Sequence, residues 1–350
     1  MSFDPNAPAQ PGSGIFGLPF TEEEARIVLV PVPWEATTSY GGGAAEGPRA
    51  ILEASRQVDL FDLDVEKPYA AGIHMLALSP EVTAWNEEAK NLAAGVIEVG
   101  GAGDDPALQK ALAAVNARSE DVNRWVEGAV GKQLAAGKLV GVIGGDHSVP
   151  FGAFKALAAH RQGKPFGVLH FDAHSDTRIA YEGFEHSHAS IMYNALQGEP
   201  AIGKLVQVGI RDVCEQEVAW TGSQGDRVRV FYDRDLSRRK YDGEPFGKIA
   251  KEIAAALPDD VWVSFDIDGL DPRYCPNTGT PVPGGLELQE AIAILRAVVL
   301  AGKRIVGFDL NEVAPNLDDE EDEWDGNVGA RLLYKLIGFT LASQGHARLL

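Results

Sequence analysis

The stretch Phe166-Gly-Val-Leu-His-Phe-Asp-Ala-His-Ser-Asp176 decides the fold, because an apolar run ends there in a burst of polar and charged side chains. The run does not alternate polar with apolar residues, which is typical of a strand buried on both faces. In an extended segment, residues two apart project to the same side. We therefore expect Asp172, His174 and Asp176 to converge at the carboxyl end of a buried strand.

Similar apolar runs recur along the chain and alternate with longer amphipathic stretches. The strand-like runs begin at Ile27, Leu139, Phe166, Leu205, Val228, Val261 and Arg304. The helix-like stretches cover residues 48–55, 107–136, 149–160, 248–256, 288–301 and 329–341. This alternation predicts an α/β fold with a parallel sheet covered by helices on both faces. No internal repeat or linker interrupts it, so we expect one domain over residues 21–350, preceded by a Pro- and Gly-rich N-terminal tail, residues 1–20.

Two further strand-like runs end in side chains of the same kind. Gly144-Gly-Asp-His-Ser148 closes the run from Leu139 and makes His147 a candidate ligand, although a histidine after two glycines is more often structural. Ser264-Phe-Asp-Ile-Asp-Gly-Leu-Asp-Pro272 places Asp266 and Asp268 two residues apart in an apolar strand, and hence on one face. Ligand sites in open parallel sheets form outside the carboxyl ends of the strands. The three segments therefore predict one shared site.

Four carboxylates and two imidazoles are expected to meet at this site, and no thiolate is among them. Buried carboxylates so close together repel one another and lose hydration unless a cation neutralises them. Oxygen-rich ligation with some imidazole suits divalent ions such as Mn²⁺. Two such ions about 3.5–4 Å apart can make a nucleophile of water near neutral pH. The sequence therefore predicts a hydrolytic site with two divalent metal ions.

The composition narrows the classes of partner. The formal net charge of −20 disfavours nucleic acid and anionic membranes as partners and favours a small cationic molecule. The two cysteines, Cys214 and Cys275, lie far apart in the sequence and indicate no disulfide framework. The first residues do not have the pattern of a signal peptide, and no apolar run is long enough for a membrane span. We therefore expect a cytoplasmic enzyme.

The three motifs, in this order, resemble those of the ureohydrolase superfamily, which includes arginases, agmatinases and related guanidino hydrolases. The similarity extends from residues 31–34 and 47–50 to residues 311–315, and residues 278–286 match the agmatinase-like branch closely. The resemblance covers nearly the whole chain beyond the tail. It implies a three-layer αβα fold with a central, mostly parallel sheet, as in arginases and deacetylases. It also implies assembly as a homotrimer or homohexamer.

The resemblance implies roles for individual residues. One ion would be held by His147, Asp172, Asp176 and Asp266, and the other by His174, Asp268 and, as shared ligands, Asp172 and Asp266. Mn²⁺ is the expected metal, with Ni²⁺ as the alternative. Glu312 matches the glutamate that grips the guanidinium, although the residues alone would equally allow a surface loop acid there. A histidine that protonates the departing amine is His188 or His186, and the pattern His188-Ala-Ser190 favours His188.

The expected reaction is hydrolysis of a guanidinium C–N bond, which releases urea and an amine. Agmatine is the leading substrate, and free guanidine, alkylguanidines, biguanides and guanidino acids are alternatives. Arginine is less favoured, because no stretch resembles the substrate loops of arginases. Two readings belong to other classes of protein. One is a deacetylase with a single zinc ion, and the other is a non-catalytic subunit that needs a paralogous partner.

Overall fold

A single parallel sheet forms the centre of the molecule in this computed structural model, which describes residues 3–10, 12–319 and 321–350. The sheet order is β2-β1-β3-β8-β7-β4-β5-β6, and every described pair of neighbours is parallel. The strands are β1 (Ile27–Val32), β2 (Ile73–Met75), β3 (Leu139–Gly144), β4 (Phe166–Phe171), β5 (Ile202–Ile210), β6 (Val228–Tyr232), β7 (Asp260–Asp266) and β8 (Arg304–Asn311). The predicted α/β class with a central parallel sheet is confirmed.

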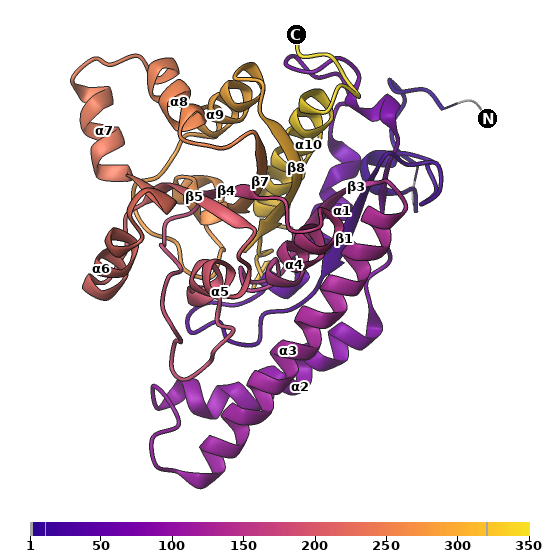
Figure 1. Cartoon of the computed structure of the whole chain (residues 1–350). Coiled ribbons are helices and arrows are strands. Elements are labelled where there is room, and N and C mark those ends of the chain that lie inside the picture. Colours follow the sequence, from indigo (N-terminus) through magenta and orange to yellow (C-terminus); the bar gives the residue numbers. More distant parts are fainter. Residues whose placement is uncertain (1–2, 11, 320) are drawn as a thin grey trace.

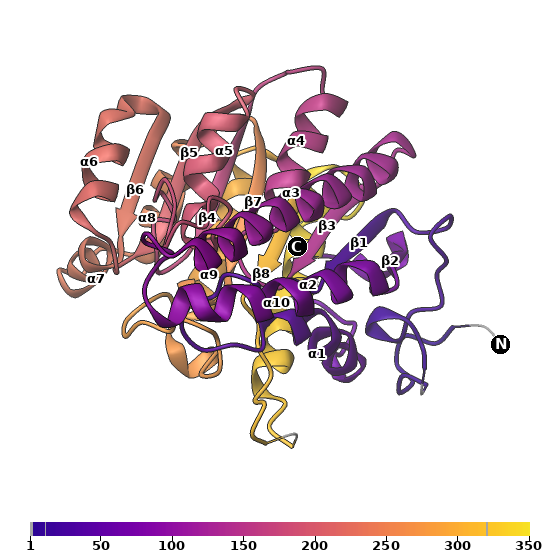
Figure 2. The same cartoon turned by 90° about the horizontal axis from the view of Figure 1, so that it is seen from below.

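Helices cover both faces of this sheet (Figures 1 and 2). The helices are α1 (Gly47–Ala54), α2 (Pro80–Glu98), α3 (Pro106–Ala135), α4 (Phe151–His160), α5 (Ile191–Gly198), α6 (Glu215–Ser223), α7 (Asp233–Tyr241), α8 (Phe246–Ala255), α9 (Leu288–Leu300) and α10 (Trp324–Ser343). One apolar core joins the sheet to α1, α8, α9 and α10, and a second core joins it to α3, α4 and α5. These two cores make the three layers that were expected.

The pattern of apolar residues missed several elements at the edges of the fold. Strand β2 has three residues, and helices α2, α5, α6 and α7 were not predicted. Helix α7 shows why, because its sequence Asp-Arg-Asp-Leu-Ser-Arg-Arg-Lys-Tyr buries only Asp233 and Leu236 and so has almost no apolar stripe. Helix α2 does carry a start signal, since the Ser79 side chain accepts a hydrogen bond from the Val82 amide and Pro80 follows it.

The end of the predicted N-terminal tail packs against the domain. Ile15, Phe16 and Leu18 are buried in the first core. The Phe16 amide donates a hydrogen bond to Ser55 Oγ at 2.9 Å, and the Phe16 ring lies 4.9 Å from the Tyr334 ring. Residues 15–18 are therefore held in place by α10 and by the turn after α1.

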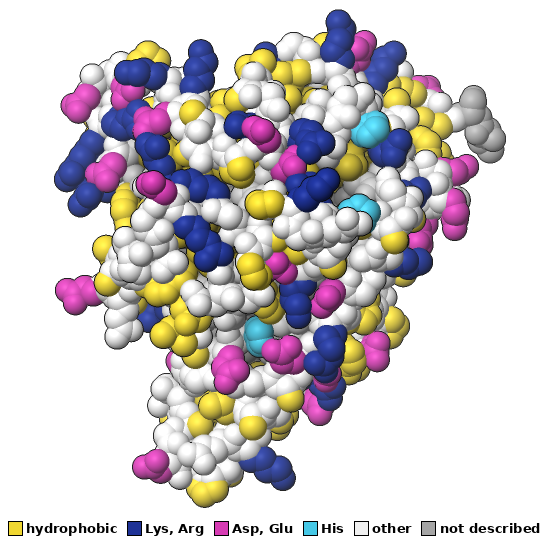
Figure 3. Space-filling model, in the orientation of Figure 1, with side chains coloured by type: hydrophobic (Ala, Val, Ile, Leu, Met, Phe, Trp, Pro, Cys, Tyr) yellow, Lys and Arg dark blue, Asp and Glu magenta, His cyan; other side chains and the backbone are white. Residues whose placement is uncertain are grey.

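In the part of the chain that the structure describes, no helix combines the length and the apolarity that crossing a bilayer requires. On the face shown in Figure 3, acidic and basic side chains lie intermixed.

The topology brings four strand ends together. Strands β3, β8, β7 and β4 are neighbours in the middle of the sheet, and all four point the same way. Strands β3 and β4 follow one another in the sequence, but β8 and β7 lie between them in the sheet. The strand order therefore reverses in the middle of the sheet. Such switch points leave a crevice outside the carboxyl ends. The loops after β3, β4, β7 and β8 carry the predicted site residues.

Candidate metal centre and substrate cavity

His147 is placed by a tight turn at the end of β3. A Cβ atom at Gly145 would lie 2.0 Å from the carbonyl oxygen of Trp34, so this position requires glycine. The Asp146 amide donates to that same carbonyl at 2.8 Å, and the Asp146 side chain accepts a hydrogen bond from the Ser148 amide at 2.9 Å. These contacts fix the His147 backbone, and its side chain is 1% exposed.

The His147 ring faces three of the predicted carboxylates. Its Nδ1 lies 3.0 Å from Asp172 Oδ2, 3.1 Å from Asp266 Oδ2 and 3.6 Å from Asp176 Oδ2. Its Nε2 points the other way and lies 2.8 Å from Ser264 Oγ. One ring nitrogen therefore faces the acidic cluster, and the other is bound behind it.

The segment after β4 brings its three side chains together, but not as a continuous extended strand. Strand β4 ends at Phe171, and Asp176 adopts a left-handed conformation with φ of 55°. The Asp172 carboxylate accepts a hydrogen bond from the His174 amide at 2.5 Å. His174 Nδ1 lies 3.0 Å from Asp268 Oδ2 and 3.5 Å from Asp172 Oδ1. The predicted convergence is correct, whereas its derivation from strand alternation fails at Asp176.

Asp266 and Asp268 also converge through a turn. Strand β7 ends at Asp266, and a 3-10 turn follows over Ile267–Gly269. Asp266 caps this turn by accepting a hydrogen bond from the Asp268 amide at 2.9 Å. Asp268 Oδ1 accepts from the Ala173 amide at 3.0 Å, which ties the β7 turn to the β4 loop. The expectation that both aspartates lie in one strand was therefore wrong, although they do lie beside the same site.

The donor set fits divalent cations. Two groups of side chains offer ligand atoms close enough to hold an ion, and they share Asp172: His147, His170, Asp172 and Asp176 form one, and Asp172, His174 and Asp268 the other. Asp268 Oδ2 is buried, and in the described chain it has the His174 ring, at 3.0 Å, as its polar neighbour. Oxygen-rich sites with some imidazole are those that Mn²⁺ and similar ions occupy. His170 was not predicted to lie at this site, because it stands inside the apolar run of β4 and not after its end.

The electrostatics of the cluster show an excess of negative charge. Burial raises the pKa of Asp176 and of Asp266 well above the usual range, and the neighbouring carboxylates raise it further. Burial opposes protonation of His174, but the Asp268 and Asp172 carboxylates outweigh it and raise its pKa to about 12. Burial also opposes protonation of His147, but the neighbouring carboxylates, chiefly Asp172, outweigh it and raise the pKa of His147 to about 9. A cluster that takes up protons so readily is one that cations would stabilise.

Glu312 lies beside this cluster, between His147 and His188. It is the first residue after β8, it has a left-handed φ of 62°, and its amide donates to the Gly145 carbonyl at 2.8 Å. Its side chain is almost fully buried, and Oε1 accepts a hydrogen bond from the His147 amide at 3.0 Å. Oε2 is buried and has no hydrogen-bond partner within the described chain. The strained backbone thus holds a buried carboxylate that has one oxygen without a hydrogen-bond partner in the described chain.

The two candidate proton-transfer histidines face different surroundings. His188 lines the cavity, and its Nδ1 lies 3.4 Å from Glu312 Oε1. Burial opposes its protonation, but the contact with Glu312 and the Asp146 charge raise its pKa. His186 is directed toward α3, where its Nε2 lies 2.7 Å from Glu120 Oε1. In the pair, only His188 is a wall residue of the cavity.

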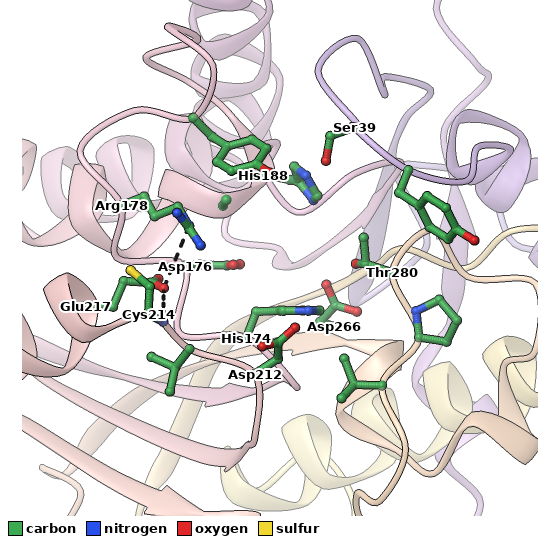
Figure 4. Close-up of a pocket in the computed structure, with 16 residues that line it drawn as sticks. Ser39, His174, Asp176, Arg178, His188, Asp212, Cys214, Glu217, Asp266 and Thr280 are labelled. Carbon is green, nitrogen blue, oxygen red and sulfur yellow. Dashed lines mark hydrogen bonds and ion pairs between the residues drawn. The ribbon is translucent and has the colours of Figure 1, made fainter. Parts of the chain in front are cut away.

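A cavity of about 420 Å³ opens over the cluster (Figure 4). His174, Asp176 and Asp266 line it together with His188 and Thr280. Its other walls come mostly from loops and include Ser39, Tyr40, Arg178, Tyr181, Asp212, Val213 and Cys214, together with Glu217 of α6. Arg178 stacks over the Tyr181 ring at 5.0 Å, and its Nε lies 3.8 Å from Glu217 Oε2. These wall residues were not predicted, because most of them come from loops whose sequence has no regular spacing, and Glu217 comes from α6, which was not predicted either.

The arginase family model matches residues 25–338. The chain belongs to the arginase family.

Relatives of this arginase-family chain are similar over most of their length. N(1)-aminopropylagmatine ureohydrolase from Thermus thermophilus is 34% identical over 319 residues, which are 90% of each chain. Guanidinopropionase from Pseudomonas aeruginosa is 30% identical over 330 residues, covering 91% of this chain and 88% of its own. The solved structure of agmatine ureohydrolase from Thermoplasma volcanium has a TM-score of 0.70 at 25% identity, covering 95% of this chain and 96% of its own.

These relatives confirm two of the predictions. The resemblance to ureohydrolases, drawn from three short motifs, is confirmed by similarity along the whole domain. The three-layer fold is confirmed by the solved structures, which include the arginase from Bacillus caldovelox at a TM-score of 0.62.

Proposed function

We propose that this arginase-family chain is a metal-dependent amidinohydrolase, which cleaves a guanidinium C–N bond and releases urea and an amine. The observation that carries the proposal is the meeting of three features in the wall of one cavity and directly beneath it. These are an acidic His/Asp cluster, the free carboxylate oxygen of Glu312, and the His188 ring 3.4 Å from that carboxylate.

Two divalent ions would be held by the residues of the cluster. His147, Asp172, Asp176 and Asp266 would hold one, and His174 and Asp268, with Asp172 and Asp266 shared, would hold the other. Mn²⁺ is the leading metal, and Ni²⁺ is the alternative. Ions at this place would supply Lewis acidity, which activates water at neutral pH and stabilises the developing negative charge of the reaction.

Glu312 would bind and orient the guanidinium. A carboxylate and a planar guanidinium form charge-assisted hydrogen bonds, and these are strongest where water is excluded. Oε1 already accepts from the His147 amide, which restrains the carboxylate, and the buried Oε2, which has no partner in the described chain, would accept an N–H of the substrate. Since Glu312 Oε1 and His147 are directly joined, the guanidinium would lie next to the metal ligands.

His188 would hold the proton that the departing amine needs. An amine leaves poorly unless it is protonated, and a positioned histidine can act as the general acid. His188 lies on the cavity wall beside Glu312, and its raised pKa keeps it protonated at higher pH than a free histidine. His186 is the second candidate, but its contact with Glu120 directs it toward α3.

Agmatine is the first substrate to test. The net charge of −20 attracts small cations, and the names of two relatives refer to agmatine or its aminopropyl derivative. A guanidino acid is the second candidate, because Arg178 puts a cation on the cavity wall where a distal carboxylate could pair with it. The name of the Pseudomonas relative refers to such a compound. Free guanidine, alkylguanidines and biguanides would occupy only the inner part of the cavity.

We further propose a cytoplasmic homotrimer or homohexamer, without nucleic-acid or membrane partners. A chain that is active only beside a paralogous subunit is the alternative from another class. The pure chain distinguishes the two, because fully metallated protein without turnover on any guanidino compound would support the partner-dependent alternative.

The test is urea release from a panel of substrates. Protein reconstituted separately with Mn²⁺ and with Ni²⁺ would be assayed on agmatine, arginine, 4-guanidinobutyrate, guanidine, dimethylguanidine and metformin. We expect urea from at least one compound, and we expect Glu312→Gln to bind the same amount of metal while losing most of that activity. Urea at the same rate from Glu312→Gln would contradict the assigned role. Absence of urea from every compound would contradict activity of the isolated chain.

A further inference from the structure

His170 lies beside the metal cluster without having been assigned a role. It is fully buried in β4, two residues before Asp172. Its Nε2 lies 2.8 Å from Asp172 Oδ2, and its Nδ1 lies 3.0 Å from Nε2 of Gln207 on β5. By distance alone it belongs to the group of side chains that could hold an ion. Its hydrogen bonds decide between a ligand and a supporting residue.

The amide of Gln207 is fixed in one orientation. Its Nε2 donates to the Ser175 carbonyl at 2.7 Å, and its Oε1 accepts from Ser175 Oγ at 3.1 Å. The side chain is fully buried. Turning the amide over would place its oxygen against the Ser175 carbonyl oxygen, so two acceptors would face each other and the carbonyl would lose its donor, which is costly in a buried place. The NH₂ group therefore faces His170.

The orientation of this amide sets the tautomer of His170. An amide nitrogen only donates, so His170 Nδ1 must be the acceptor and Nε2 must carry the proton of the neutral ring. That Nε2–H group points at Asp172 Oδ2, which accepts it. A nitrogen that carries a proton has no lone pair for a metal ion.

We propose that His170 is a positioning residue for the metal centre and is not one of its ligands, with Gln207 setting its tautomer. The inference rests on the proposed function, because it assigns a role at the same metal site. Asp172 is shared by both ligand groups, so orienting its carboxylate affects both ions. Gln207 also binds the Ser175 carbonyl, next to the strained Asp176. One amide from β5 thereby restrains two of the predicted ligands before any ion arrives.

The experiment measures Mn²⁺ binding to the metal-free full chain by calorimetric titration. Loss of a partner behind a metal ligand commonly weakens binding by about 10- to 100-fold. We expect this loss for His170→Phe, which removes the Nε2–H donor to Asp172. We expect it also for Gln207→Met, which removes the amide that keeps the proton of His170 on Nε2. In both variants the number of ions per chain should remain two. His170→Gln places an amide NH₂ near the position of Nε2, and we expect it to keep most of the wild-type affinity.

The controls separate positioning from folding. Gln133→Met changes another buried glutamine, which lies on α3 and contacts Glu22, and it should bind Mn²⁺ like the wild type. Thermal melts of each metal-free variant show whether it is folded. Should His170→Phe fail to fold, the pair of His170→Gln and Gln207→Met still tests the proposal.

Several outcomes would overturn the inference. If His170→Gln loses one ion per chain, His170 is a ligand. If His170→Phe and Gln207→Met fold and bind as the wild type does, neither residue positions the site. A wild-type chain that binds fewer than two ions would overturn the proposed function, and this inference with it.

Discussion

The two histidines predicted to hold metal differ in how the protein supports them. His147 is buried, and its Nε2 lies 2.8 Å from Ser264 Oγ, which donates to Asp309 Oδ1 at 2.8 Å. Because the serine proton goes to Asp309, Ser264 accepts from His147 Nε2–H, and in the neutral ring that a metal ion would bind, the lone pair of Nδ1 faces the carboxylates. His174 is 26% exposed at its side chain and lines the cavity, and no hydrogen bond of its Nε2 is found in the described chain.

This difference divides the centre into a buried half and an open half. The buried half, around His147, Asp172 and Asp176, is held by hydrogen bonds from behind, through Ser264 and through His170. The open half, around His174 and Asp268, reaches the cavity through the partly exposed His174, whereas Asp268 beneath it is buried. Of the buried half, Asp176 also borders the cavity. Side chains held from behind keep their geometry without the ion, and exposed ones exchange more readily with water. We therefore expect the two ions to differ in affinity and in rate of release.

The largest effect is expected at the residue that the two halves share. Asp172→Ala removes a carboxylate that belongs to both ligand groups, and it leaves His147 and His174 without their common partner. We predict loss of both ions and of turnover, measured by elemental analysis after gel filtration and by urea release. If the variant keeps one ion per chain, then only one of the two halves depends on Asp172.

At the cavity wall, we expect a substitution to lower kcat without changing the number of bound ions. General acids contribute about 10²- to 10⁴-fold to rate, so His188→Asn should lower kcat by about that factor while two ions stay bound. His186→Asn is the matched control, since His186 binds Glu120 instead of facing the cavity, and it should be close to wild type. If His186→Asn loses the rate and His188→Asn does not, the proton donor has been assigned to the wrong histidine.

A smaller effect separates the buried half from the open one. Ser264→Ala removes the link between His147 and Asp309, and we predict that the affinity for one of the two ions falls by about 10- to 100-fold. Ser119→Ala, a buried serine on α3 that bonds only to its own helix, is the control. Equal weakening of both ions in the Ser264 variant would argue against independent halves.

The smallest effect is expected where the open half meets the substrate. Arg178→Gln removes a cation from the cavity wall, and charges about 4 Å apart interact by about 1 kcal/mol in water. The ratio of kcat/KM for agmatine to that for 4-guanidinobutyrate should therefore rise by about fivefold. Arg229→Gln is the matched control, because Arg229 also stacks on an aromatic ring but is not one of the residues that line the cavity. An unchanged ratio in the Arg178 variant would place the distal end of the substrate elsewhere.

The sequence predicted the parts of this molecule that follow a simple period or spacing. The central strands are buried on both faces, so their apolar runs stand out, whereas β2 is too short and α7 too polar to do so. The six predicted ligands lie at or shortly after strand ends, and parallel topology brings such ends together. Their local geometry was not predicted, because a left-handed residue at Asp176 and a turn at Asp268 have no signal in the strand pattern.

Other residues could not be predicted, for a different reason. His170 looks like any residue of a buried strand, and its role depends on Gln207, which is distant in sequence and reaches it only through the pairing of β4 with β5. Arg178 and Tyr40 reach the cavity from loops whose paths depend on tertiary contacts. Spacing rules describe regular elements, and long-range hydrogen bonds and loop conformations lie outside them.

The most direct test is a count of metal ions per chain during timed chelation, with urea release followed in the same samples. We predict two ions at the start, a fast loss of one, a slow loss of the other, and disappearance of turnover with the first. A single ion per chain, or loss of both in one phase with turnover unaffected until the end, would contradict a centre made of a buried and an open half.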